Sequence, residues 1–92
     1  MSADVRKAVD YLSGLPGVRR IWLFGSAAKG RALDARSDLD FSIEGLASTA
    51  LCGTWSELDQ RLDHEVDLVR WEEASEALRH QIRTHGILLY ER

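Results

Sequence analysis

Two aspartates stand two residues apart in a segment that alternates polar and apolar side chains. They are Asp38 and Asp40 in the run from Ser37 to Ile43, which reads SDLDFSI. Alternate side chains of a β-strand share a face, so we expect both carboxylates and Ser42 on one face. Like charges side by side repel unless a cation or a proton compensates them. Because Mg²⁺ prefers carboxylate oxygens together with substrate phosphates, the pair predicts a site for a metal-bound phosphate compound.

A short strand ending in a glycine-serine turn precedes these aspartates. Residues Ile21 to Phe24 form an apolar run of β-favouring side chains that stops at Gly25. Glycine adopts backbone conformations that are closed to other residues, and Ser26 offers both a hydroxyl group and an N-cap oxygen. We therefore expect Gly25 and Ser26 to hold phosphate.

The stretch after this turn is small-residue and basic. From Ser26 to Leu33 it predicts one or two helical turns, whose positive N-terminal end attracts anions. Lys29 and Arg31 are further candidates for phosphate binding. A P-loop is excluded, because Gly30 is followed by Arg31 and Ala32 rather than by lysine and a hydroxyl residue.

A third acidic segment follows later in the chain. The run from His64 to Arg70 has β-like alternation, with Glu65 and Asp67 on one face. If this strand neighbours the one that carries the aspartate pair, either acid could face that pair. His64 could act as a base, but a lone histidine at the start of a strand is more often a surface residue.

These residues resemble one known family, the nucleotidyltransferase superfamily of DNA polymerase beta. The resemblance is carried by Gly25-Ser26, Gly30, Asp38-x-Asp40 and Asp67 inside a hydrophobic strand. Within the superfamily the chain is most similar to the minimal nucleotidyltransferases (MNT proteins), which are often encoded beside a HEPN protein as the antitoxin of a toxin-antitoxin pair. The resemblance covers nearly the whole chain.

Two features depart from the family pattern. Eleven residues separate Ser26 from Asp38, where ten are usual, and we place the extra residue near Leu33 to Arg36. Position 27 is alanine, where many members carry an arginine that contacts phosphate.

The resemblance implies a chemistry and a role for each residue. A hydroxyl group would attack the α-phosphorus of ATP, with two Mg²⁺ ions held by Asp38, Asp40 and Asp67. Asp67 would also help to deprotonate the hydroxyl, with Glu65 as the reserve candidate for the third carboxylate. Gly25 and Ser26 would bind the β- and γ-phosphates.

The resemblance also implies a partner. The acceptor would be a tyrosine of a HEPN ribonuclease toxin, and transfer of AMP would silence that toxin. Two alternatives stay open, namely an antitoxin that blocks its HEPN partner by contact alone, and nucleotidyl transfer to a small molecule.

Composition and length limit the function classes. The chain has 92 residues, of which 45% are hydrophobic and 29% charged, so we expect one domain over residues 1–92. A net charge of −3 and a pI near 5.5 argue against broad nucleic-acid binding. No signal peptide or membrane-spanning run is apparent, which predicts a cytoplasmic protein. The single cysteine, Cys52, cannot form an internal disulfide, and we expect a half-buried structural thiol.

Periodicity predicts an α/β fold, a nucleotidyltransferase-fold domain with a small mixed sheet of three to four strands and about four helices. Expected helices cover Ala3 to Ser13, a segment starting with a capping box at Thr54, and a segment starting near Glu72 and Glu73 that ends before Gly86. Their inner faces would include Val5, Ala8, Val9 and Leu12, then Trp55, Leu58 and Leu62, then Ala74, Ala77, Leu78 and Ile82. Residues Ala47 to Gly53 would form a loop. The tail from Ile87 to Tyr90 could be an edge strand or could meet a partner chain in a homo- or hetero-oligomer.

Overall fold

The structure is a computed structural model and describes residues 3–25, 28 and 38–92. Its centre is a four-stranded sheet in the order β3-β2-β1-β4. The strands are β1 (Arg20–Phe24), β2 (Leu39–Glu44), β3 (Val66–Arg70) and β4 (Ile87–Glu91). β1 is antiparallel to β2 and β4, whereas β2 and β3 are parallel. The predicted α/β class and mixed sheet are confirmed.

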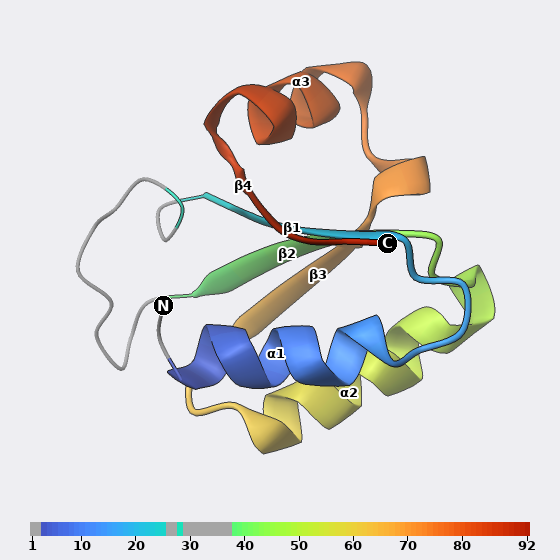
Figure 1. Ribbon diagram of the computed structural model, residues 1–92, viewed down its shortest axis with the longest axis vertical. Helices are drawn as coiled ribbons and strands as arrows, with labels where there is room; N and C mark the ends of the chain where they lie inside the picture. The colour runs from blue at the N-terminus through green and yellow to red at the C-terminus, as the bar shows by residue number, and fades with distance from the viewer. Residues whose placement is uncertain (1–2, 26–27, 29–37) are drawn as a thin grey trace.

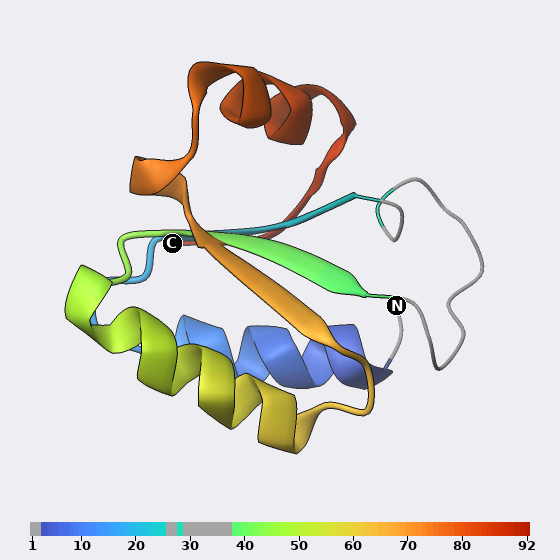
Figure 2. The same cartoon turned by 180° about the vertical axis from the view of Figure 1, so that it is seen from behind.

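Helices cover both faces of the sheet. α1 (Ala3–Ser13) and α2 (Leu51–Arg61) lie side by side on one face, and α3 (Glu76–His85) lies over the other (Figures 1 and 2). We call these the paired-helix face and the α3 face. Short 3-10 turns, η2 (Ser48–Ala50) and η3 (Trp71–Glu73), precede α2 and α3. Within the described residues, no helix has both the length and the apolar character needed to cross a membrane.

The hydrophobic core fills the paired-helix face. Leu39, Phe41 and Ile43 of β2 are completely buried there, as the alternation predicts. Other core members from the strands and from α1 and α2 are Val5, Ala8, Leu12, Ile21, Leu23, Leu58, Val66 and Leu68. Burial of these side chains fixes the register of β2, because a slip by one residue would expose all three of its apolar side chains. The polar residues of β2 are thereby held on the α3 face.

Two aromatic side chains cover the middle of the α3 face of the sheet. Trp22 of β1 lies opposite Ser42 in the sheet and stacks on Trp71 of η3, with ring centroids 5.9 Å apart. Ser42 is completely buried, and its hydroxyl group has no hydrogen-bond partner among the described residues. Asp40, two residues earlier, is only half-buried. The accessible part of this face therefore lies toward the start of β2.

The prediction for the second helix was wrong at its start. α2 begins at Leu51 rather than at Thr54, and the expected loop from Ala47 to Gly53 contains η2 and the first helical residues. Thr54 is a buried residue of the helix and not its cap. Packing of Leu51 against the core favours the earlier start. Gly53 lies in open space, where a helical glycine costs only about 1 kcal/mol.

The start of the last helix also differs from the prediction. Glu72 and Glu73 lie in η3, and α3 begins at Glu76 because the Ser75 side chain accepts a hydrogen bond from the Leu78 N–H at 3.1 Å. Ala77 is consequently exposed, and the buried contact of α3 is made by Ile82. The predicted end before Gly86 is confirmed.

The predicted first helix is confirmed, whereas the predicted environment of Cys52 is wrong. The helix over Ala3 to Ser13 is confirmed in its bounds, although Val9 is only half-buried. Cys52 is an exposed free thiol on α2, which contradicts the expected half-buried position. The helical turns expected over Ser26 to Leu33 lie, apart from Ala28, outside the described residues.

The C-terminal tail forms an edge strand, which decides a question that the sequence left open. β4 pairs with β1 and leaves Ile87 and Leu88 exposed by 44% and 41%. Arg20 of β1 bridges the two neighbouring strands, because it forms ion pairs with Glu44 of β2 at 2.7 Å and with Glu91 of β4 at 2.6 Å.

Candidate functional site

Two of the predicted carboxylates face each other across neighbouring strands. Asp40 of β2 and Asp67 of β3 are register partners in the parallel pair. Paired residues of adjacent strands point to the same side of the sheet, which here is the α3 face. Asp67 is exposed, and Asp40 is half-buried. β3 is the outer strand of the sheet, so Asp67 faces solvent at its edge.

The third predicted carboxylate lies just ahead of this pair. Asp38 is exposed and directly precedes β2. Its position relative to β3 is set by the Leu39 N–H, which donates a hydrogen bond to the Glu65 carbonyl oxygen at 2.9 Å. Glu65 is exposed and directly precedes β3. The structure thus brings all four acidic residues to the end of the sheet where β2 and β3 begin.

The electrostatics distinguish Asp67 from Glu65. The pKa of the Asp40 carboxyl is raised above 3.8, first by burial, then by the negative charge of Asp67 and then by that of Asp38. Glu65 is not among these causes. Asp40 is therefore the electrostatic centre of the group, and among the described residues Asp67 is the charge that acts on it most strongly.

No basic side chain relieves this repulsion within the described residues. Their ion pairs involve neither Asp38, Asp40 nor Asp67. In the same part of the chain, no three His, Cys, Asp or Glu side chains are already gathered into a metal cage. Mg²⁺ needs no such cage, because it usually binds through one or two carboxylates and takes its other oxygens from phosphate and water. The carboxylate donors at Asp40 and Asp67 fit that ion.

Gly25 lies directly against the Asp40 carboxylate. Its φ angle is +76°, which favours glycine, and a Cβ atom at this position would overlap the Asp40 Oδ2. The Gly25 carbonyl oxygen accepts a hydrogen bond from the Ala28 N–H at 3.2 Å. The sharp change of direction after β1 is thus placed beside the carboxylates. The other predicted phosphate-binding residues, Ser26, Lys29 and Arg31, lie outside the described residues.

His64 has a structural contact that the sequence did not reveal. Its ring Nδ1 and its backbone N–H both form hydrogen bonds with the Asp4 Oδ2, as does the Asp63 N–H. These bonds hold the chain ahead of β3, so the strand begins at Val66 rather than at His64 as predicted. Asp4 was missed because an acidic residue in the first turn of a helix is ordinarily explained by the helix dipole.

Comparison with known proteins indicates the family of the chain. The family model described as polymerase beta, nucleotidyltransferase matches residues 6–92. No curated protein gives a significant match.

Several solved structures are similar in fold. A toxin-antitoxin complex with AMP-PNP has a chain 29% identical to this one, with a TM-score of 0.77, covering 97% of this chain and 72% of that chain. A complex of the tri-AMPylated HEPN toxin of Shewanella oneidensis with an MNT antitoxin has a chain that is 28% identical, with a TM-score of 0.75 and coverage of 97% of this chain and 71% of that chain. A candidate minimal nucleotidyltransferase is 29% identical, with a TM-score of 0.70 and coverage of 90% and 87%. With a family match that spans residues 6–92, the chain belongs to the polymerase beta nucleotidyltransferase family.

Proposed function

We propose that the protein transfers AMP from ATP to a tyrosine hydroxyl of a HEPN toxin and acts as the antitoxin of that toxin. The observation that carries this proposal is the pairing of Asp40 with Asp67 on adjacent parallel strands beside Gly25. It places two carboxylates, with Asp38 close by, next to a turn at which the backbone can approach phosphate. Family membership supplies the reaction class.

Asp38, Asp40 and Asp67 are the residues that would hold Mg²⁺. The half-buried Asp40, whose pKa is raised by burial and by its acidic neighbours, provides a place where a divalent cation removes an existing repulsion. When bound, Mg²⁺ supplies charge neutralisation for the triphosphate and alignment of its reacting groups.

In the proposed reaction a hydroxyl group of the acceptor replaces pyrophosphate on ATP, and residues of the chain bind the phosphates and take up the proton. The acceptor oxygen forms a bond to the α-phosphorus, the bond from that phosphorus to the bridging oxygen breaks, and pyrophosphate leaves. Asp67 is exposed on the outer strand of the sheet and would take the proton of the incoming hydroxyl. Gly25 and Ser26 would bind the β- and γ-phosphates, with Lys29 and Arg31 adding positive charge.

The choice of acceptor and nucleotide is supported by what the similar structures contain. One is a toxin-antitoxin complex with AMP-PNP, and another is an MNT antitoxin with a tri-AMPylated HEPN toxin. A HEPN protein encoded near this chain is accordingly the partner to test, and ATP is the nucleotide to test first.

The direct test measures transfer to the partner. The protein is incubated with Mg²⁺, each nucleoside triphosphate in turn and the neighbouring HEPN protein, and the intact mass of the partner is recorded. We expect added adenylyl groups with ATP and none with Asp40→Asn or Asp67→Asn. Asp59→Asn, which removes an exposed carboxylate from α2, is the matched control and should retain transfer.

The same variants address the contact-only alternative. Toxicity of the HEPN protein is scored in cells that co-express wild type, Asp38→Asn or Asp40→Asn. Loss of neutralisation by both variants, with complex formation intact, supports transfer. Continued neutralisation without any added mass on the partner would refute it.

A further inference from the structure

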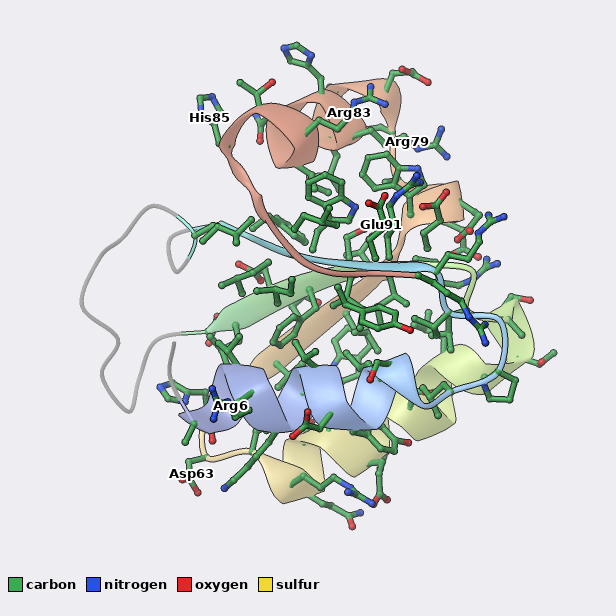
Figure 3. All side chains as sticks on the ribbon, in the orientation of Figure 1. Arg6, Asp63, Arg79, Arg83, His85 and Glu91 are labelled. Atoms are coloured by element: carbon green, nitrogen blue, oxygen red, sulfur yellow. The ribbon has the colours of Figure 1, made fainter. Side chains whose placement is uncertain are left out.

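A cavity lies beside the carboxylates, between the end of β1 and α3. It has a volume of about 380 Å³, which is within the usual range for sites that bind small molecules. The described residues that line it are Phe24, Gly25, Leu78, Gln81, His85 and Gly86. Figure 3 shows His85 at the end of α3 nearest to the end of β1.

The described lining residues combine apolar surfaces with hydrogen-bonding side chains. Phe24 provides an aromatic surface and Leu78 an aliphatic one, whereas Gln81 and His85 provide hydrogen-bonding groups. The described lining contains neither a carboxylate nor a lysine or arginine. A lining of this kind suits a heteroaromatic base, which stacks on aromatic rings and is read through its polar edge.

The cavity is held in shape from both ends of α3. Leu78, Gln81 and His85 are spaced by three and four residues, so they share one face of the helix. Ser75 caps the start of the helix. At its end, a Cβ atom on Gly86 would overlap the Ile82 carbonyl oxygen and would lie 3.1 Å from that of Leu23, so the glycine permits close contact with β1.

The cavity adjoins the site of phosphate chemistry. Gly25 lines the cavity and also contacts the Asp40 carboxylate. The strand order β3-β2-β1 puts Asp67 and the cavity on opposite sides of Asp40. An acceptor that approaches Asp67 at the outer strand would therefore leave the cavity free for another part of the reacting molecules.

We propose that this cavity binds the base of the nucleoside triphosphate and that Gln81 and His85 determine which base is accepted. This inference rests on the proposed nucleotidyl transfer, since it assigns the part of the substrate that the carboxylates do not hold. The Gln81 amide carries a donor and an acceptor side by side, which is the arrangement that pairs with the N6 and N7 edge of adenine. The cavity thereby gives the protein a preference for ATP over GTP.

The test compares ligands with and without a base. Dissociation constants of the full chain for ATP, GTP, CTP, UTP and tripolyphosphate are measured by titration calorimetry in Mg²⁺. Gln81→Ala and the double variant Gln81→Ala/His85→Ala are expected to bind ATP roughly ten-fold more weakly, and to lose the preference for ATP, because a bidentate base contact is removed. Binding of tripolyphosphate should not change.

Matched controls lie on the same helix. His80→Ala and Thr84→Ala remove exposed side chains of α3 that do not line the cavity, and they should behave as wild type. Circular dichroism verifies that each variant is folded. As an independent readout, 2-azidoadenosine triphosphate should label a peptide that contains α3 or Phe24 of the wild-type protein.

The outcomes separate the two proposals. If wild type binds neither ATP nor tripolyphosphate, the proposed function fails, and the base site fails with it. If wild type binds and transfers AMP but the cavity variants retain their affinity for ATP, only the base site is refuted. The base site is also refuted if these variants bind ATP as wild type does but bind the HEPN protein more weakly. That result would assign the cavity to binding of the acceptor.

Discussion

Asp40 carries a charge that the described residues do not neutralise. Its pKa is raised by burial and by Asp67 and Asp38, so the ionised form destabilises the folded state in the absence of a cation. The protonated form contributes stability that is lost as the pH rises through the raised pKa. The carboxylate that we propose as an ion ligand thus destabilises the ion-free fold when it is ionised.

Replacement of Asp40 by asparagine should separate stability from activity. In the presence of a chelator at neutral pH, Asp40→Asn is expected to raise the melting temperature by a few degrees while it abolishes transfer. The difference from wild type should shrink as the pH falls toward 3.8, because wild type then becomes protonated at this position. Thermal melts across this pH range measure the effect. If Asp40→Asn instead melted at a lower temperature than wild type at neutral pH, the ionised Asp40 carboxylate would already be stabilised by another group of the protein.

Gly25 is the second residue whose type is set by the candidate site, because only glycine fits against the Asp40 carboxylate. Gly25→Ala introduces a side chain at φ +76° and pushes its Cβ into the Asp40 carboxylate. We expect a loss of stability of about 1–3 kcal/mol and a loss of transfer. Denaturant unfolding gives the first quantity and the intact mass of the partner gives the second. Gly53→Ala, at a helical position in open space, is the matched control and should stabilise the protein.

At the scale of elements, Asp4 joins α1 to the start of β3. Burial alone would raise the pKa of this carboxyl, but hydrogen bonds from the His64 side chain, the His64 N–H and the Asp63 N–H outweigh burial, and the pKa is lowered. A lowered pKa stabilises the fold above the unfolded value of 3.8, and this stability is lost as the pH falls through the folded value.

Asp4→Asn should therefore destabilise the protein at neutral pH, by about 1–3 kcal/mol, because the part-buried N–H groups of Asp63 and His64 lose a charged acceptor. The loss should diminish below pH 3.8, where the wild-type carboxyl also becomes protonated. Chemical denaturation at neutral and acidic pH measures both. Asp10→Asn, at an exposed position of the same helix, should have little effect at either pH.

The sequence predicted strands better than helix starts. Alternation in β2 identified the buried Leu39, Phe41 and Ile43, because burial of one face imposes a period of two. Local capping signals misplaced α2, since packing of Leu51 on the core prevailed over the capping box at Thr54. For α3 the residue that caps the helix, Ser75, was overlooked in favour of the acidic pair before it.

At the scale of the whole molecule, ion binding and folding should be coupled. If Mg²⁺ binds the folded carboxylates and not the unfolded chain, it stabilises the domain by about 2.7 kcal/mol at a concentration one hundred times its dissociation constant. We expect the melting temperature of wild type to rise with Mg²⁺ and that of Asp40→Asn to rise much less. Differential scanning calorimetry measures this, with Na⁺ at equal ionic strength as the control. Equal shifts in both proteins would contradict binding at Asp40.

Long-range contacts explain why only part of the site could be predicted. The pair at Asp38 and Asp40 is local, so periodicity placed it correctly, and the choice of Asp67 depended on the resemblance to a family. The contact between Asp4 and His64 spans sixty positions of the chain and leaves no periodic signal. The cavity under α3 likewise depends on how the last helix returns to β1, which no local pattern encodes.

The positions of α1 and of Arg92 in the fold have a practical consequence for protein engineering. The Arg92 N–H bonds to the Arg19 carbonyl oxygen at 2.8 Å, just before β1, whereas Gly25 follows the opposite end of that strand. The first turn of α1, by contrast, is fastened through Asp4 to the segment that leads into β3. A purification tag or fluorescent fusion attached after Arg92 would therefore leave the molecule away from the carboxylates, and one attached ahead of α1 would emerge close to the start of β3.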